Sequence, residues 1–234
     1  MTGMLASVNS LAEARLVLQV GVDIIDLKQP EQGALGALSL ADVKAIVADV
    51  NGRCPVSATI GDLPMQAELV YNAVKAMAET GVDYVKIGFF PGGDWPGTLD
   101  KLSGLTALNY RLIAVLFADI QPDFSILTAI KTAGFTGVMV DTMDKSGGTL
   151  TQLMSDNVIT AFIKEAKEQS LLCGLAGSLR LADVDLLMPY EPDYLGFRGA
   201  LCQAHKRVGH LNISAVETIK NLMSKNNLTK YRLR

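Results

Sequence analysis

Two lysines and one carboxylate stand in segments that otherwise have the composition of buried strands. Asp26 and Lys28 interrupt the apolar segment 21–30, GVDIIDLKQP, and Lys86 occupies a similar segment at 81–90, GVDYVKIGFF. Residues two apart on a strand point to the same face, so Asp26 and Lys28 are expected to share one side. Neighbouring amines removed from water lose protons more readily, and a neutral lysine attacks carbonyls. The pattern therefore predicts imine (Schiff-base) chemistry, in which a second lysine moves protons.

The elements that must position these residues are short apolar runs that alternate with helix-like stretches along the chain. Eight runs are expected to be strands: 4–8, 23–28, 56–60, 83–88, 112–119, 137–142, 171–177 and 193–199. The stretches between them carry apolar residues at helical spacing. Helix boundaries are expected at serine caps and at helix-ending glycines, namely Ser10, Ser39, Gly21, Gly81 and Gly134. Such repetition predicts parallel strands joined by helical crossovers.

The length and composition of the chain fit a closed α/β barrel. Its 234 residues are close to the ~250 that are typical of this fold, and 49% hydrophobic residues support a large core. We expect one domain over residues 1–234, a single (β/α)8 (TIM) barrel, with a short basic C-terminal tail from about residue 225. A doubly wound open sheet is the alternative. It is disfavoured because no Gly-rich dinucleotide fingerprint follows the first strand.

Composition also argues against several classes of protein. A net charge of -3 disfavours a nucleic-acid partner, and no stretch is long and apolar enough to span a membrane. The N-terminus has no signal-peptide pattern and the three cysteines fit reduced thiols, so a cytoplasmic location is expected. No Cys/His cluster has metal-ligand spacing, so neither a metal nor another cofactor is expected. Helices rich in Ala, Leu and Met are compatible with a homo-oligomer interface, and equally with packing on the strands.

In a barrel of this type the reacting groups lie at the carboxyl ends of the strands, and unusual polar residues fall there. Each of them alone is more often a solvated side chain or a helix cap. Three lysines and three aspartates at one rim nevertheless indicate a shared site, and glycine-rich turns at 145–150, 174–179 and 196–201 are typical of phosphate binding. We expect the following residues to bind substrate or phosphate: Thr59, Asp119, Gly147, Gly148, Gly177, Ser178, Arg198 and Gly199. The residues predict carbonyl activation on a phosphorylated small molecule.

Five motifs add a resemblance to this interpretation. They are DLKQPEQGALGA (26–37), YVKIGFF (84–90), DTMDKSGGTL (141–150), GLAGSL (174–179) and LGFRGAL (195–201). Together they resemble the (5-formylfuran-3-yl)methyl phosphate synthase family, from about Met4 into the last helix. The resemblance implies a (β/α)8 barrel that condenses two molecules of glyceraldehyde 3-phosphate into a furan aldehyde phosphate, with release of phosphate and water. The product of that family is a precursor of methanofuran-type one-carbon carriers.

The resemblance also implies roles for individual residues. Lys28 is the expected Schiff-base residue and Lys86 the expected proton acceptor. Asp141 and Lys145 match active-site positions of the family, and Asp26 is expected to support Lys28. The resemblance therefore implies a lyase that acts on a triose phosphate and requires no metal or organic cofactor.

Other barrel chemistries are alternatives at this stage. The spacing Asp26-x-Lys28-x-x-Glu31 is similar to the Asp-x-Lys-x-x-Asp motif of the orotidine phosphate decarboxylase group, but it ends in glutamate and contains Pro30. A transaldolase-like enzyme or a triose phosphate aldolase would share the lysine imine and differ in its product. A non-catalytic phosphate-binding barrel would keep its function after the substitution Lys28→Ala.

Overall fold

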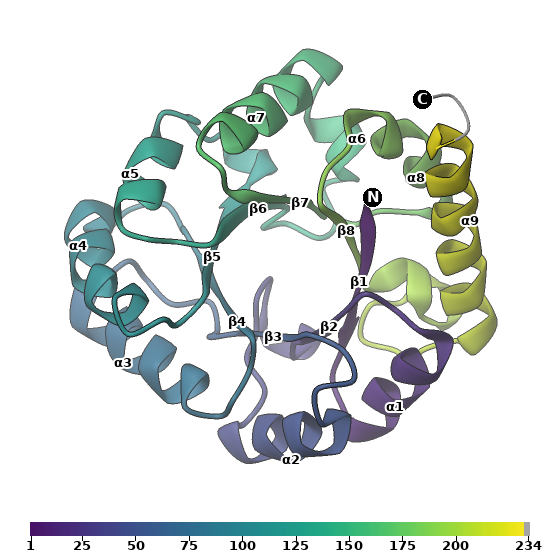
Figure 1. Cartoon of the computed structure of the whole chain (residues 1–234), viewed down its shortest axis with the longest axis horizontal. Helices are drawn as coiled ribbons and strands as arrows, with labels where there is room; N and C mark the ends of the chain where they lie inside the picture. Colours follow the sequence, from purple (N-terminus) through teal and green to yellow (C-terminus); the bar gives the residue numbers. More distant parts are fainter. Residues whose placement is uncertain (232–234) are drawn as a thin grey trace.

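Eight parallel strands close into a barrel, and helices form a ring around it (Figure 1). The computed structural model describes residues 1–231. Each strand pairs with the next in the chain, and the last pairs with the first, so the sheet has no free edge. The strands are β1 (Gly3–Val8), β2 (Ile24–Leu27), β3 (Val56–Thr59), β4 (Tyr84–Gly88), β5 (Leu112–Phe117), β6 (Gly137–Asp141), β7 (Leu172–Leu175) and β8 (Tyr194–Phe197). The predicted fold is confirmed.

The outer ring consists of the α-helices that follow the strands in the chain. They are α1 (Leu11–Val20), α2 (Leu40–Val50), α3 (Ala67–Ala78), α4 (Trp95–Thr106), α5 (Ile126–Thr132), α6 (Leu150–Leu153), α7 (Asp156–Glu168), α8 (Leu181–Leu187) and α9 (Ile213–Tyr231). Short 3-10 helices lie in the loops: η1 (Pro30–Gln32), η2 (Ala118–Ile120), η3 (Met188–Tyr190), η4 (Gly199–Leu201) and η5 (Gln203–His205).

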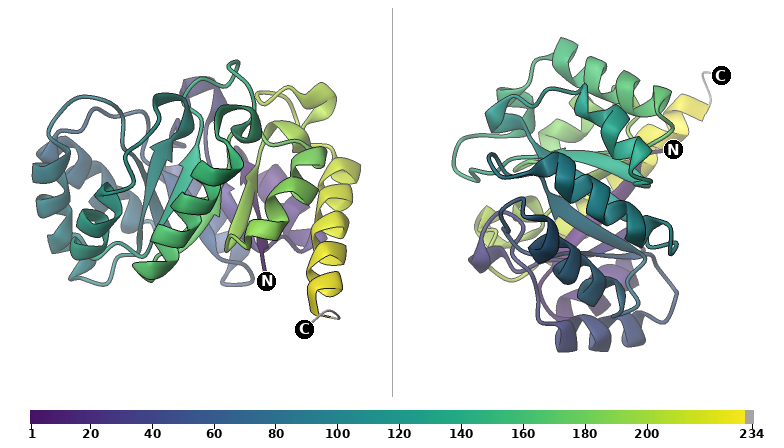
Figure 2. Two further views of the ribbon diagram at one scale, coloured as in Figure 1. Left: turned by 90° about the horizontal axis from the view of Figure 1, so that it is seen from above. Right: turned by 90° about the vertical axis from the view of Figure 1, so that its left-hand side faces the viewer.

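Local sequence signals account for several helix boundaries. The Ser10 hydroxyl accepts a hydrogen bond from the amide of Glu13, and Ser39 caps α2 in the same way. Gly21 ends α1 in the left-handed conformation, with φ of 80°. The expected basic tail is helical as far as the structure describes it, because α9 continues to Tyr231 beside α1 and α8 (Figure 2). Residues 232–234 lie outside the described part.

The barrel interior is closed on one side by the loop that follows β2. Ala34 and Leu35 from this loop join the side chains that fill the barrel, and Leu35 is fully buried. The Asp62 carboxylate accepts the amides of Ala34 at 2.7 Å and Leu35 at 2.6 Å. A side chain at Gly88 would collide with Leu35, since an added Cβ would lie 2.8 Å from Leu35 Cδ1. The loop after β2 therefore covers the carboxyl-terminal mouth of the barrel near β4 and leaves the mouth open near β6, β7, β8 and β1.

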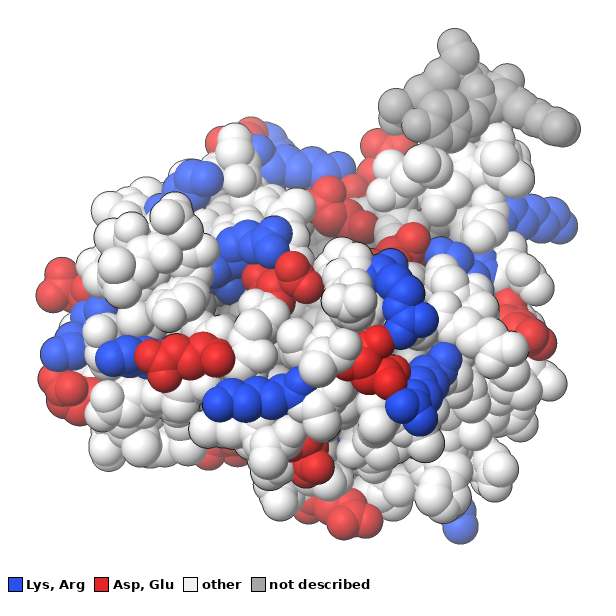
Figure 3. Space-filling view, turned by 60° about the horizontal axis from the view of Figure 1, so that its bottom comes forward, with Lys and Arg blue, Asp and Glu red and all other residues white. Residues whose placement is uncertain are grey.

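The outer surface carries charges of both signs. Figure 3 shows one face, on which Lys and Arg side chains lie interspersed with Asp and Glu side chains. Within residues 1–231, no helix combines the length and the apolar character that crossing a bilayer requires.

Candidate active site

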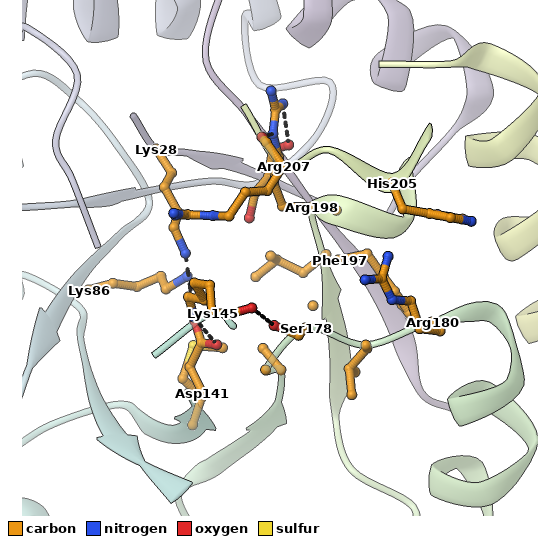
Figure 4. A pocket seen from close by; sticks show the side chains of 18 residues that line it. Lys28, Lys86, Asp141, Lys145, Ser178, Arg180, Phe197, Arg198, His205 and Arg207 are labelled. Carbon is orange, nitrogen blue, oxygen red and sulfur yellow. Dashed lines mark hydrogen bonds and ion pairs between the residues drawn. The ribbon is translucent and has the colours of Figure 1, made fainter. Parts of the chain in front are cut away.

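A cavity of about 110 Å³ lies at the carboxyl ends of the strands. Three lysines that the sequence analysis selected, Lys28, Lys86 and Lys145, all line it, together with Asp141. In Figure 4 these four side chains converge on one side of the cavity, whereas Arg180 and His205 lie on the other. Residues that are far apart in the sequence thus share one small space.

Asp26 is the centre of the deeper charge cluster. Its fully buried carboxylate accepts hydrogen bonds from Lys86 Nζ at 3.0 Å, Ser57 Oγ at 2.6 Å and Ser7 Oγ at 2.8 Å. Strand register produces this arrangement, because Ser7, Asp26 and Ser57 are direct neighbours across β1, β2 and β3. A buried ion pair offsets its desolvation cost only when hydrogen bonds complete it, and both serine hydroxyls do so here.

The partner of Asp26 differs from the expected one. The sequence analysis expects Asp26 to support Lys28, but the carboxylate binds Lys86. Two residues along a strand advance the chain by about 6.6 Å, so Lys28 reaches the next level towards the mouth. There its Nζ lies 3.6 Å from Asp141 Oδ2. Asp26 therefore acts on Lys28 only at longer range.

Asp141 connects the other two lysines. One carboxylate oxygen accepts a hydrogen bond from Lys145 Nζ at 2.6 Å and from the amide of Thr142 at 2.7 Å. Lys145 also donates to the Thr142 carbonyl. Burial alone would raise the pKa of Asp141, but the Lys145 and Lys28 ammonium groups outweigh it and hold that pKa well below its usual range. Asp141 is thus a permanent negative charge beside Lys28.

Lys28 carries an amine that loses its proton more easily than an ordinary lysine. Burial is the main cause that lowers the pKa of Lys28 from 10.5 to about 7, and the positive charges of Lys145 and Lys86 act in the same direction. Asp141 and Asp26 oppose this shift without cancelling it. A lysine of this pKa is partly neutral near pH 7 and can attack a carbonyl carbon.

The turns after β7 and β8 form the opposite wall. Gly177, Ser178 and Gly199 line the cavity as expected. Gly177 has a φ of +114°, a backbone conformation that glycine adopts without strain. Arg180, His205 and Arg207 also line the cavity, and the sequence analysis did not select them. The basic run at 205–207 contains two of them, His205 and Arg207, but it lies too far beyond the last strand for its direction to be inferred.

Four expected binding residues do not line this cavity. Thr59 donates its hydroxyl to the carbonyl of Gly36 at 2.9 Å, and so fixes the loop after β2. Asp119 lies in η2, because β5 ends at Phe117, and its carboxylate accepts the amides of Met143 and Asp144. Asp119 thereby shapes the loop that carries Lys145. Gly147 and Gly148 are the other two expected binding residues that do not line the cavity.

Arg198 lines the cavity but has no N–H group left for a ligand. It forms a buried ion pair with Glu13 and donates further hydrogen bonds to the carbonyls of Ser7, Arg207 and Gly209. These five bonds use all five guanidinium N–H groups. Arg198 therefore joins the loop after β8 to α1 instead of presenting a free cationic donor.

Metal ligation finds no support in this arrangement. Among residues 1–231, no group of three or more His, Cys, Asp and Glu side chains could hold a metal ion.

Comparison with known proteins identifies the family. Residues 4–220 match the sequence profile of the family described as 4-HFC-P synthase. The chain belongs to this family. It is an enzyme family of lyases in methanofuran biosynthesis, so the resemblance that the motifs indicated is confirmed.

Named relatives extend over most of the chain. A (5-formylfuran-3-yl)methyl phosphate synthase from Methanosarcina acetivorans is 33% identical, over 83% of this chain and 88% of that protein. One from Methanocaldococcus jannaschii is 29% identical over 94% and 98%, respectively. A Methylorubrum extorquens protein that carries the same name provisionally is 43% identical over 87% and 84%.

Solved structures with little sequence identity share the fold. The 3-hexulose-6-phosphate synthase of Salmonella typhimurium superimposes with a TM-score of 0.70 at 15% identity, covering 96% of this chain and 100% of that one. Phosphoribosyl anthranilate isomerase from Thermus thermophilus gives a TM-score of 0.68 at 11% identity, covering 96% and 99%. These likenesses concern the barrel alone.

Proposed function

We propose that this protein condenses two molecules of glyceraldehyde 3-phosphate into (5-formylfuran-3-yl)methyl phosphate through an imine on Lys28. The observation that carries the proposal is the buried Lys28 amine, whose pKa is lowered to about 7, at 3.6 Å from Asp141. Membership of the family supplies the identity of the product. The substrate is accordingly a small triose phosphate.

The first step joins Lys28 to one triose. The neutral amine attacks the aldehyde carbon, and the resulting hydroxyl leaves as water, which forms the imine. Lys145 lies beside Asp141 and supplies an ammonium proton to the departing hydroxyl. The Asp141 carboxylate then balances the positive charge of the protonated imine.

The second step creates a carbon nucleophile. The neutral form of the Lys86 amine removes a proton from the carbon next to the imine, and the electron pair moves towards the imine nitrogen to give an enamine. Asp26 balances the charge of the Lys86 ammonium through the 3.0 Å contact. The imine nitrogen thus takes up the electrons, and no other cofactor is needed.

The remaining steps form the ring. The enamine attacks the aldehyde of the second triose and makes the new carbon–carbon bond. Elimination of one phosphate, ring closure and loss of water complete the furan, whose aromaticity favours the product. Hydrolysis of the bond to Lys28 releases the product and regenerates the free amine. The backbone N–H groups of Gly177, Ser178 and Gly199 and the side chains of Arg180 and Arg207 are suited to bind phosphate.

Borohydride trapping tests the proposal. The protein is incubated with glyceraldehyde 3-phosphate, reduced and digested, and mass spectrometry locates any adduct, with Lys28→Arg as the control. We expect a triose adduct on the peptide that contains Lys28 and a furan aldehyde phosphate as product. Furan formation without an adduct would mean that the lysines act by charge and proton transfer alone. An adduct with a sugar phosphate product would favour an aldolase, and neither adduct nor turnover would favour a binding barrel.

We further propose that the protein acts in the cytoplasm. The three cysteines, Cys54, Cys173 and Cys202, are free and buried, and burial raises the pKa of Cys173 to about 12. Thiols of this kind suit a reducing compartment. Recovery of the protein in the cytosolic fraction of lysed cells is the expected result.

A further inference from the structure

A second cavity lies below the active site, at the amino-terminal ends of the strands. Its volume is about 220 Å³, and the first residues of four strands line it: Ile24, Tyr84, Leu172 and Tyr194. A water molecule needs only about 10–15 Å³ of such space when polar partners are available. Ser57, Lys86 and Asp193 bring polar groups to this lining. The lower cavity can therefore hold several waters.

Lys86 lies between the two cavities and lines both of them. Lys86 has an exposed fraction of 2%, and Asp26 has none, so the pair is separated from bulk solvent. When two triose phosphates fill the upper cavity, water reaches Lys86 poorly from the mouth. The lower cavity is at the opposite end of the barrel, so substrates in the upper cavity leave it unfilled.

A chain of hydrogen bonds links the pair to the lower cavity. Lys86 Nζ lies 3.0 Å from Asp26 Oδ1, and the same oxygen lies 2.6 Å from Ser57 Oγ. Ser7 binds the other carboxylate oxygen at 2.8 Å, but it lines the upper cavity. The two serines thus make similar bonds to Asp26 and face opposite ends of the barrel.

We propose that Ser57 is a positioning residue that resets Lys86 by passing its proton through the barrel floor to water in the lower cavity. The Ser57 hydroxyl first turns its hydrogen from Asp26 to water. The Lys86 ammonium then gives one proton to Asp26, and Asp26 passes a proton to the Ser57 oxygen as Ser57 releases its own proton to water. Lys86 ends neutral, Asp26 ionised and Ser57 unchanged. This inference rests on the proposed role of Lys86 as the base.

Three variants and three measurements test the route. Ser57→Ala removes the relay hydroxyl, Ser57→Thr retains one, and Ser7→Ala removes the matched bond on the other side of Asp26. The measurements are kcat and KM, the solvent deuterium isotope effect on kcat, and the yield of the borohydride-trapped Lys28 adduct. We expect Ser57→Ala to lower kcat roughly 10- to 100-fold, the scale of a lost proton transfer, with a larger isotope effect and an unchanged adduct yield. Ser57→Thr should restore kcat and the solvent isotope effect to their wild-type values.

The control variant Ser7→Ala distinguishes a proton relay from simple support of the Asp26 carboxylate. We expect Ser7→Ala to lower kcat while the isotope effect stays at the wild-type value, because proton release is intact. If Ser57→Ala and Ser7→Ala lower kcat equally, each with the wild-type isotope effect, both hydroxyls only hold Asp26 in place. That result, or a wild-type kcat in Ser57→Ala, overturns the relay and leaves the proposed function intact.

A fourth variant tests the water path without changing Ser57. Ile24→Phe adds a bulky ring to the lower cavity, and we expect a lower kcat with a larger isotope effect. A wild-type kcat in this variant overturns the path through the floor. If the unmodified enzyme forms no imine adduct, the proposed function fails first, and the relay fails with it.

Discussion

The chemistry of single residues in this site depends on which carboxylate each lysine meets. Lys86 hydrogen-bonds directly to Asp26, whereas Lys28 stands 3.6 Å from Asp141, which also serves Lys145. A shared and more distant carboxylate stabilises an ammonium less, so burial dominates at Lys28. This difference separates the proposed nucleophile from the proposed base, although both are buried lysines.

The pH dependence of imine formation follows from the lowered pKa of Lys28. Below about pH 7 the amine is an ammonium and cannot attack, so we expect the trapping rate to rise with pH and level off above that value. Asp141→Asn removes a charge that raises the pKa of Lys28, so its midpoint should move to lower pH. Rates of borohydride trapping across pH measure both midpoints. A midpoint that moves to higher pH in Asp141→Asn would contradict this reasoning.

The same burial makes Lys28 costly to the stability of the fold. In the unfolded chain Lys28 keeps its ordinary pKa of 10.5, so between pH 7 and 10.5 the unfolded state binds more protons. Lys28→Met should therefore raise the free energy of unfolding by roughly 3–5 kcal/mol at and below pH 7, at about 1.36 kcal/mol per pKa unit. The gain should shrink as pH rises towards 10.5, which urea denaturation at several pH values measures. A gain independent of pH would point to packing instead.

At the scale of elements, the loops at the mouth are fixed to one another by charged side chains. Asp62 in the loop after β3 holds the loop after β2, and Asp119 after β5 holds the loop after β6. Arg198 joins the loop after β8 to α1 through Glu13. Each such contact positions a loop that carries cavity-lining side chains. These residues support the site without facing the ligand.

The buried ion pair of Arg198 with Glu13 of α1 can be compared with an exposed ion pair that Arg15 of the same helix makes. Arg198→Lys cannot replace five N–H groups, so we expect a loss of about 3–5 kcal/mol in unfolding free energy, typical of a broken buried pair. Arg15 likewise pairs with a carboxylate, that of Asp49, but the Arg15 side chain is 62% exposed. Arg15→Ala should therefore cost much less, because water and salt screen an exposed pair. Urea denaturation measures both, and similar losses would show that burial of Arg198 contributes little.

At the scale of the whole molecule, closure joins the two ends of the chain. β1 pairs with β8, and α9 covers the junction between α8 and α1 (Figure 1). The amide of Thr2 donates to the Asn227 side chain, and Lys220 pairs with Asp23. The first strand therefore requires the last helix, and we expect the barrel to unfold as one cooperative unit.

The contribution of α9 to closure can be measured with two neighbouring positions. Ile219 lies on the buried face of α9, whereas Glu217 lies on its exposed face. Ile219→Ala should lower the free energy of unfolding by about 2–5 kcal/mol, as truncations in a packed core do. Glu217→Ala should stay within about 0.5 kcal/mol. Thermal or urea unfolding tests the pair, and a second transition in Ile219→Ala would show that α9 detaches independently.

Much of this protein could be predicted from its sequence because local patterns are strong. Short apolar runs, helical spacing and serine caps depend on neighbouring residues, so the eight strands and the barrel were predictable. Lys28 and Lys86 were selected because charged residues in apolar strands are costly unless they serve a site. Lys145 was selected from its loop at the same rim and from the family resemblance. Strand order then brought them to one rim, as the parallel topology requires.

Tertiary structure decided how these residues pair and which of them meet the cavity. Asp26 binds Lys86 and not Lys28, because pairing depends on strand register and depth in the barrel. Thr59 and Asp119 face backbone groups of neighbouring loops, and Arg207 turns into the cavity from beyond the last strand. Contacts of this kind join residues that are distant in the chain. Their geometry depends on packing of the closed barrel, and sequence spacing carries no record of it.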